Sequence, residues 1–146
     1  MQRLIDAWFE IGREQRPQHY RVRTHDGWQL ALYRYLPTKR SHRTPVLLCH
    51  GMSSNRWDMD GPGDISLARY LLRHGYDVWI VELRGAGRST RPTWWNGKRY
   101  NWRFEDYVQH DAPAALRKVL GETGARQIHW VGHSMGGMIG YALLMT

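Results

Sequence analysis

The chain has 146 residues, 42% of them hydrophobic, and its lysines and arginines outnumber its acidic residues by 21 to 13. This length and composition predict a single globular domain spanning residues 1–146 and exclude a disordered chain. One cysteine, Cys49, excludes an intrachain disulfide and a cysteine-rich zinc site. The basic residues are spread along the sequence without a nucleic-acid-binding motif, so we expect a solvated basic surface and no nucleic-acid partner.

The N-terminal residues predict a short amphipathic helix over 3–14, because apolar side chains recur there at helical spacing and Pro17 ends the pattern. Residues 1–12 lack the uninterrupted apolar core of a signal peptide. No window of the sequence reaches the roughly 20 apolar residues of a transmembrane segment. We therefore expect a cytoplasmic protein.

Two strands are predicted next, over 19–25 and 28–36, joined by the turn signal Asp26-Gly27. Trp28, Leu30 and Leu32 are expected on one face of the second strand, opposite Gln29, Ala31 and Tyr33. Strands and helices then alternate, which predicts an α/β fold with a parallel sheet and helices on both faces. The predicted elements are a strand at 46–49, a helix at 64–74, a strand at 76–83, a helix at 104–120, a strand at 128–131 and a helix at 136–145.

Three residues set the expected limits of these helices. Asp64 is the predicted N-cap of the first one, and Gly75 its C-terminal stop. Pro113 is expected to kink or divide the second helix. Glycine-bearing turns follow three of the strands, at His50-Gly51, Arg84-Gly85 and His133-Ser134. Because active sites of open α/β sheets form at the carboxyl ends of the strands, these turns predict one functional rim.

Residues 130–137, Trp-Val-Gly-His-Ser-Met-Gly-Gly, are the most specific pattern in the chain. They predict the end of a strand, a sharp turn with Ser134 at its apex, and the start of a helix. Gly132 and Gly136 lie two residues before and after Ser134, where a crowded turn has no room for Cβ atoms. Such a turn holds a serine hydroxyl clear of the sheet. The alternative is a serine that only caps a helix.

Four motifs in this order resemble the α/β-hydrolase family, within it the lipase and esterase branch and especially its monoglyceride lipases. The resemblance covers nearly the whole chain and implies the N-terminal part of an α/β-hydrolase fold, with the later strands and the lid absent from this sequence. The motifs are the hairpin of residues 24–37, the turn His50-Gly51-Met52, the turn from Glu82 to Ser89, and Gly132 to Gly137.

The resemblance implies that Ser134 is the nucleophile and that the backbone N–H groups of Met52 and Met135 form the oxyanion hole. It also implies that His50, Gly51, Gly132 and Gly136 support these two turns, and that neither a metal nor a cofactor takes part. The family places its acid and then its histidine after the serine, and no position of this sequence matches either one. We therefore expect the triad to be incomplete in this chain.

A histidine of this chain could still act as the base. His133 adjoins Ser134, but the turn is expected to point neighbouring side chains apart, and His50 is expected to brace the oxyanion turn. His129 is expected to be structural, and His110 lies beside Asp111 in a predicted helix. The histidines expected at the surface are His19, His25, His42 and His74.

The stretch from Arg84 to Arg103 carries six basic and no acidic residues, together with Trp94, Trp95 and Trp102. Three interpretations remain open: packing of a long loop over the core, a wall of the substrate pocket, or a surface that binds single-stranded nucleic acid or sugars. The resemblance also implies that strand 128–131 lies at an uncovered apolar edge. We therefore expect a homo-oligomer, or aggregation through this edge.

The leading hypothesis is a serine hydrolase that acts on a small carboxylic ester or lipid through an acyl-serine intermediate. The alternative is a catalytically incomplete module of the same fold, which acts as an interaction partner or takes its acid and histidine from a second chain. An epoxide- or haloalkane-type hydrolase is disfavoured, because those enzymes carry aspartate where this chain has Ser134.

Overall fold

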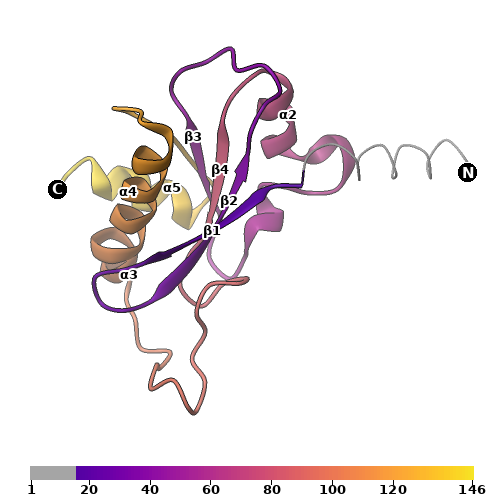
Figure 1. The fold of residues 1–146 in the computed structure, drawn as a ribbon. Coiled ribbons are helices and arrows are strands. Elements are labelled where there is room, and N and C mark those ends of the chain that lie inside the picture. The colour runs from indigo at the N-terminus through magenta and orange to yellow at the C-terminus, as the bar shows by residue number, and fades with distance from the viewer. Residues whose placement is uncertain (1–15) are drawn as a thin grey trace, which may run out of the picture.

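The computed structural model describes residues 16–146, so the helix predicted over 3–14 lies outside the described residues. A five-stranded mixed sheet forms its centre (Figure 1), in the order β1-β2-β4-β3-β5. The hairpin strands β1 and β2 and the pair β2 and β4 run antiparallel, whereas β3 runs parallel to both β4 and β5. The strands are β1 (Gln18–Arg23), β2 (Gln29–Tyr35), β3 (Val46–Cys49), β4 (Val78–Glu82) and β5 (His129–Gly132).

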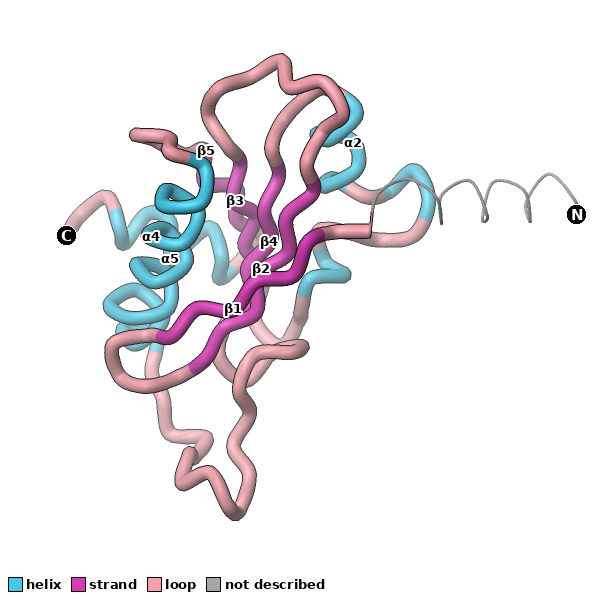
Figure 2. The backbone as a smooth tube through the Cα atoms, viewed as in Figure 1, coloured by secondary structure: helices cyan, strands magenta, loops and turns pink. Residues whose placement is uncertain are grey.

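Helices cover both faces of this sheet, with α2 on one face and α4 and α5 on the other (Figures 1 and 2). This arrangement confirms the predicted α/β fold and the alternation of strands and helices after the hairpin. The helices are α2 (Leu67–Arg73), α3 (Phe104–Asp106), the π-helical segment η3 (Tyr107–Asp111), α4 (Ala112–Thr123) and α5 (Met135–Leu143), with short 3-10 turns η1 (Arg56–Asp58) and η2 (Gly63–Ile65).

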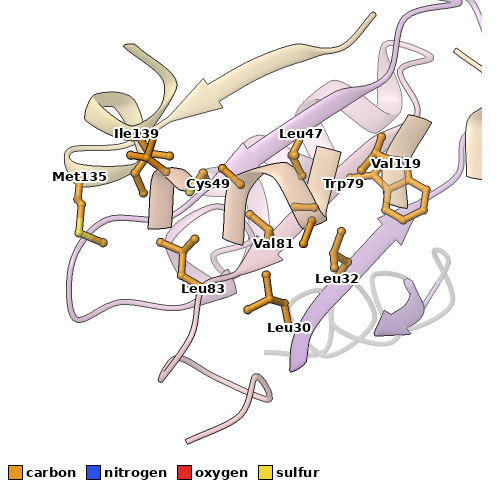
Figure 3. Close-up of a cluster of buried hydrophobic side chains, with 14 residues drawn as sticks. Leu30, Leu32, Leu47, Cys49, Trp79, Val81, Leu83, Val119, Met135 and Ile139 are labelled. Atoms are coloured by element: carbon orange, nitrogen blue, oxygen red, sulfur yellow. The ribbon is translucent and has the colours of Figure 1, made fainter. Parts of the chain in front are cut away.

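The sheet is buried on both sides, because alternate residues of each strand supply two separate cores. Leu30 and Leu32 face the core beneath α4 and α5, which Figure 3 shows with Leu47, Val81 and Ile139. Their neighbours Ala31 and Tyr33 face the core beneath α2. The predicted alternation along β2 is therefore correct, and both of its faces are apolar because both are covered.

The prediction of Asp64 as a helix N-cap is wrong. Asp64 lies in η2, and α2 begins later, after Ser66, whose hydroxyl accepts a hydrogen bond from the N–H of Arg69 at 3.1 Å. Gly75 follows the helix with a φ of +82°, as a left-handed helix stop requires. Ser66 lies only two residues after Asp64, and serine and aspartate are about equally good N-cap residues, so the sequence does not distinguish them.

Pro113 does not break the predicted helix: residues 104–123 are helical throughout, and the helix passes from α3 through the π-helical segment η3 into α4. A proline lacks the N–H that a continuous helix needs, and here it occupies the first turn of α4, directly after the π-helical segment η3. Helix α4 then runs past Gly121 and ends at Gly124, which has a φ of +66°. Among residues 16–146, no helix is long and apolar enough to cross a membrane. The cytoplasmic location stays a prediction.

Candidate active site

Ser134 occupies a backbone conformation that few residues other than glycine adopt, with φ +50° and ψ −118°. It lies between the end of β5 and the start of α5, as the pattern predicts. A Cβ atom on Gly132 would lie 2.2 Å from the carbonyl carbon of Gly136, and one on Gly136 would lie 2.3 Å from the carbonyl oxygen of Cys49. The turn is thus packed tightly on itself and on β3, and both glycines are required by contact.

The turn after β3 lies directly against this serine. A Cβ atom on Gly51 would lie 3.4 Å from the Cβ of Ser134, and the N–H of His133 donates to the carbonyl of Cys49 at 3.0 Å. Met135 begins α5, so its N–H has no acceptor within the helix. Among the described residues, no hydrogen bond uses the N–H of Met52. Two backbone donors on adjoining turns are therefore available beside Ser134.

His50 ties the turn after β3 to the turn after β4. The ring is buried, and its Nε2 accepts a hydrogen bond from the N–H of Leu83 at 3.1 Å. Nδ1, which then carries the hydrogen, donates to the carbonyl of Gly51 at 2.7 Å. Burial lowers the pKa of His50, and the contact with Gly51 and the nearby carboxylates oppose this only partly. A neutral ring whose lone pair is already engaged braces the turn and is a poor candidate for the base.

Asp58 was not singled out in the sequence, yet it joins the two turns at the rim. Its Oδ2 accepts from the N–H of Gly51 at 2.9 Å and contacts Nδ1 of His133 at 2.8 Å. Burial disfavours the ionised carboxylate, but these two hydrogen bonds outweigh it and lower the pKa of Asp58. Asp58 lies 75 positions before His133 in the sequence, and only the fold brings the two residues together. No local sequence pattern could therefore have identified Asp58.

The other histidines lie apart from this arrangement. His110 stacks with His25 at 6.5 Å between ring centroids, and its Nδ1 is buried without a hydrogen-bond partner. No hydrogen bond among the described residues reaches the hydroxyl of Ser134. The surface positions predicted for four histidines are confirmed, because all of them are exposed: His19, His25, His42 and His74.

A buried ion-pair network holds the start of the loop after β4. The guanidinium of Arg84 donates to Asp111 Oδ1 at 2.7 Å and to Asp26 Oδ2 at 2.7 Å, and its backbone N–H donates to Asp111 Oδ2 at 2.9 Å. Burial alone would lower the pKa of Arg84, but the two carboxylates outweigh it and raise that pKa. Burial pushes the pKa of Asp111 upward. Because the guanidinium beside it stays charged, we take the Asp111 carboxylate to be ionised.

Glu82 organises the other half of this turn. It is buried, and its carboxylate accepts hydrogen bonds from the Tyr33 hydroxyl at 2.9 Å and from the N–H of Arg88 at 2.7 Å. A Cβ atom on Gly87 would lie 2.0 Å from its carboxyl carbon. Ser89 bridges the carbonyl of Glu82 and the N–H of Ala31. The residues of the predicted motif from Glu82 to Ser89 therefore build one interlocked turn.

Asp26, Asp106 and His110 place possible metal-ligand atoms within 4.8 Å of one another. Both oxygens of Asp26 already receive N–H groups of Arg84, at 2.7 and 3.1 Å. A permanent guanidinium at this carboxylate supplies the positive charge that a cation would bring. We therefore assign no metal to these residues.

A pocket of about 350 Å³ opens beside Ser134. Trp102 forms part of its wall and also packs edge-on against Trp28, with ring centroids 5.2 Å apart. Of the three interpretations of residues 84–103, core packing and pocket wall both apply to Trp102. They do not apply to Trp94 and Trp95, which are exposed. The pocket is lined by Met52, Trp102, Arg103, Phe104, Tyr107, Ser134, Met135 and Met138.

Sheet order, strained serine turn and flanking glycine turns together define an α/β-hydrolase. A sequence profile of the family described as alpha/beta hydrolase fold matches residues 44–146, and the chain belongs to this family. The resemblance inferred from the four motifs is confirmed. The structure is similar to that of an esterase from Pyrococcus furiosus, with a TM-score of 0.68 at 21% identity over 88% of this chain and 45% of that one.

Among proteins of known activity, the chain is similar to lipases. It is 33% identical to gastric triacylglycerol lipase of Rattus norvegicus over 139 residues, which cover 88% of this chain and 35% of the lipase. It is also 33% identical to triacylglycerol lipase 2 of Arabidopsis thaliana, over 86% of this chain and 32% of that protein. The chain thus spans about a third of the length of the curated relatives it matches.

Proposed function

We propose that this chain carries the nucleophile and the oxyanion hole of a serine hydrolase that acts on carboxylic esters. The observation that supports this most strongly is the positive φ of Ser134 between two glycines that tolerate no Cβ. A serine that merely capped a helix would use ordinary extended backbone, and its side-chain oxygen would accept a hydrogen bond from a backbone N–H of the first helical turn, whereas Ser134 makes no such side-chain cap. The strained turn instead keeps the hydroxyl available.

In the proposed reaction, Oγ of Ser134 attacks the ester carbonyl while a base accepts the hydroxyl proton. The negative charge that develops on the carbonyl oxygen is stabilised by the N–H groups of Met52 and Met135. The tetrahedral intermediate expels the alcohol and leaves an acyl-serine, which water then hydrolyses. The apolar pocket beside Ser134 receives the acyl or the alcohol group. The lipase relatives make a lipid ester the first substrate class to test.

In this proposal, none of the histidines that the structure describes acts as the base, and the base and its acid are other residues. His50 already accepts a hydrogen bond at Nε2, and His133 is engaged with Asp58 at Nδ1. The second candidate function follows from the same observation: a module that becomes active only when a histidine and an acid are supplied by another chain. Without a base, the Ser134 hydroxyl is a weak nucleophile, so we expect the described chain alone to hydrolyse esters only slowly.

Hydrolysis of a short-chain p-nitrophenyl ester by the purified chain tests the proposal, beside Ser134→Ala and beside Ser54→Ala, which removes a hydroxyl from the turn after β3. We expect activity above the uncatalysed rate that Ser134→Ala abolishes and Ser54→Ala retains. Equal, background-level rates from all three proteins would contradict hydrolysis by this chain alone and favour the module that needs a second chain. Equal, elevated rates would exclude Ser134 as the nucleophile.

A further inference from the structure

The loop between β4 and α3 projects away from the sheet at its carboxyl end (Figure 2). We call residues 91–102 the tryptophan loop. Trp94 is 89% exposed and Trp95 is 73% exposed, and Tyr100 is exposed beside them in the sequence. A single exposed apolar side chain is common, but three large aromatic side chains on one projecting loop form a patch that calls for a partner.

The tip of the tryptophan loop is built to hold its shape. The side-chain oxygen of Asn96 accepts hydrogen bonds from the N–H groups of Thr93 and Lys98, each at 3.0 Å. Its side-chain nitrogen donates to the carbonyl of Arg91 at 2.8 Å. Gly97 provides the positive φ, +67°, that closes the turn. The two tryptophans are thus presented to solvent by a turn with its own hydrogen bonds.

The base of the tryptophan loop is fixed to the domain by other contacts. Nζ of Lys98 lies 5.0 Å from the ring centroid of Trp28 and donates to the carbonyl of Asp26 at 3.3 Å. Trp102 packs on Trp28 and borders the pocket of Ser134. Tip and base therefore differ in role: the base packs on the core, whereas the tip contacts nothing that would explain its aromatic side chains.

Charge accompanies the exposed aromatic side chains. No acidic residue occurs between positions 84 and 103, and Arg91, Arg99 and Arg103 are exposed. Among the described residues, none of these three arginines forms an ion pair. Tryptophan prefers the interfacial layer of a bilayer, and clustered basic side chains are attracted to anionic headgroups. Exposed tryptophans beside exposed arginines are therefore complementary to a membrane surface that carries anionic headgroups.

We propose that the tryptophan loop docks on an anionic phospholipid surface. Trp94 and Trp95 enter the interfacial layer, and the guanidinium groups of Arg91 and Arg99 contact headgroup phosphates. Trp102, at the base of the same loop, borders the pocket of Ser134, so docking brings that pocket close to the lipid. The docking itself does not depend on the proposed function, because none of the four side chains belongs to the site.

The ring geometry favours lipid over single-stranded nucleic acid. Trp94 and Trp95 meet edge-on, with ring centroids 4.9 Å apart and planes inclined by 61°. Successive bases of a strand stack on aromatic faces that line a basic groove. A projecting tip with crossed rings offers no such row of faces, whereas it suits insertion into a soft apolar layer.

Vesicle flotation tests the proposal, because aggregated protein does not float. The full chain is mixed with phosphatidylcholine vesicles that either contain or lack phosphatidylglycerol, and the vesicle-bound fraction gives the affinity. We expect binding only with phosphatidylglycerol and its loss at high salt. Trp94→Ala with Trp95→Ala should weaken binding roughly tenfold. Arg91→Gln or Arg99→Gln should each weaken it about fivefold.

Tyr70→Ala and Arg73→Gln, exposed positions on α2, are the matched controls for lost aromatic area and lost charge, and both should bind as the parent does. Circular dichroism verifies that all variants are folded. The absence of flotation, equal flotation of loop variants and controls, or equal binding to neutral vesicles would overturn the proposal. A further outcome would also overturn it. In that outcome the parent chain does not bind vesicles but binds an oligothymidylate, as measured by tryptophan fluorescence, and the loop variants lose the oligothymidylate binding.

Discussion

At the scale of single residues, the site depends on a few positions where the backbone itself is unusual. A serine at φ +50° and ψ −118° costs about 1–3 kcal/mol relative to a relaxed backbone. The surrounding packing holds it there, since Gly136 rests directly against the carbonyl of Cys49 in β3. The strain is therefore maintained by contact between the serine turn and the central strand.

Gly136→Ala should disrupt this contact. The added methyl group would lie 2.3 Å from the carbonyl oxygen of Cys49, so we expect a loss of about 3 kcal/mol or more in the free energy of unfolding. Gly121→Ala is the control, because a Cβ there meets nothing within 4 Å and alanine favours the helix by up to about 1 kcal/mol. Urea unfolding measures both. Equal stabilities would contradict the tight packing of the turn.

His50 makes stability sensitive to mild acid. Burial lowers its pKa in the folded chain below the ordinary value of 6.5, so the unfolded chain binds a proton more readily. The contribution of neutral His50 to the free energy of unfolding is therefore complete above pH 6.5. It is lost as the pH falls from 6.5 toward the lowered pKa of the folded chain. His50→Gln, which can still accept from Leu83, should flatten this pH dependence. The free energy of unfolding is measured for both proteins between neutral and mildly acidic pH. The same pH dependence in the parent chain and in His50→Gln would refute this prediction.

At the scale of elements, the loop after β4 is fixed by charge rather than by apolar packing. Arg84 leaves β4 and meets Asp111 of η3 and Asp26 of the hairpin turn, so three elements distant in sequence are joined by one guanidinium. The π-helical segment places Asp111 inward, and Pro113 then starts α4. The tryptophan loop begins and ends at elements that this network positions.

Arg84→Met should destabilise the chain by about 3–5 kcal/mol, because it leaves two carboxylates without their partner, one of them fully buried. The comparison is Glu122→Gln, which removes the partly exposed pair with Lys118 and should cost no more than about 0.5 kcal/mol. Thermal or urea unfolding distinguishes the two. A similar small effect for both substitutions would show that the network contributes nothing beyond a surface ion pair.

Periodicity and glycine positions predicted most of the elements, whereas the polar networks could not be predicted. Strand 46–49 agrees with β3 residue for residue, because four apolar residues stand between Pro45 and His50, which limit the strand at both ends. The roles of Asp58 and Asp111 depend on which distant turns meet at the rim, and a single sequence carries no signal of that. Asp64 was misassigned because two capping residues stood close together.

At the scale of the whole molecule, β5 forms one edge of the sheet, as predicted from the resemblance. The outer side of β5 and α5 carries a second pocket, of about 390 Å³, and Val131 is 37% exposed in it. An apolar strand edge is a template for pairing with another chain. The residues that line this pocket are Trp130, Val131, Gly132, Gly137, Gly140, Tyr141 and Leu144.

We propose that the purified chain self-associates through this edge. Light scattering should give a mass above 17.2 kDa at micromolar concentration, and Val131→Lys, which places a charge on the edge, should shift the chain toward the monomer. Arg73→Gln on α2 should leave the mass unchanged. A clean monomer of the parent chain would sink this proposal.

The central claim is that the fold makes Ser134 a nucleophile, and covalent labelling tests it most directly. The chain is treated with a fluorophosphonate, whose phosphorus the serine oxygen attacks with loss of fluoride, and the labelled peptide is identified by mass spectrometry. We predict a single adduct on Ser134, formed roughly a hundredfold faster than on the urea-unfolded chain because two backbone donors stabilise the developing charge. Labelling spread over several serines, or equally slow before and after unfolding, would contradict the claim.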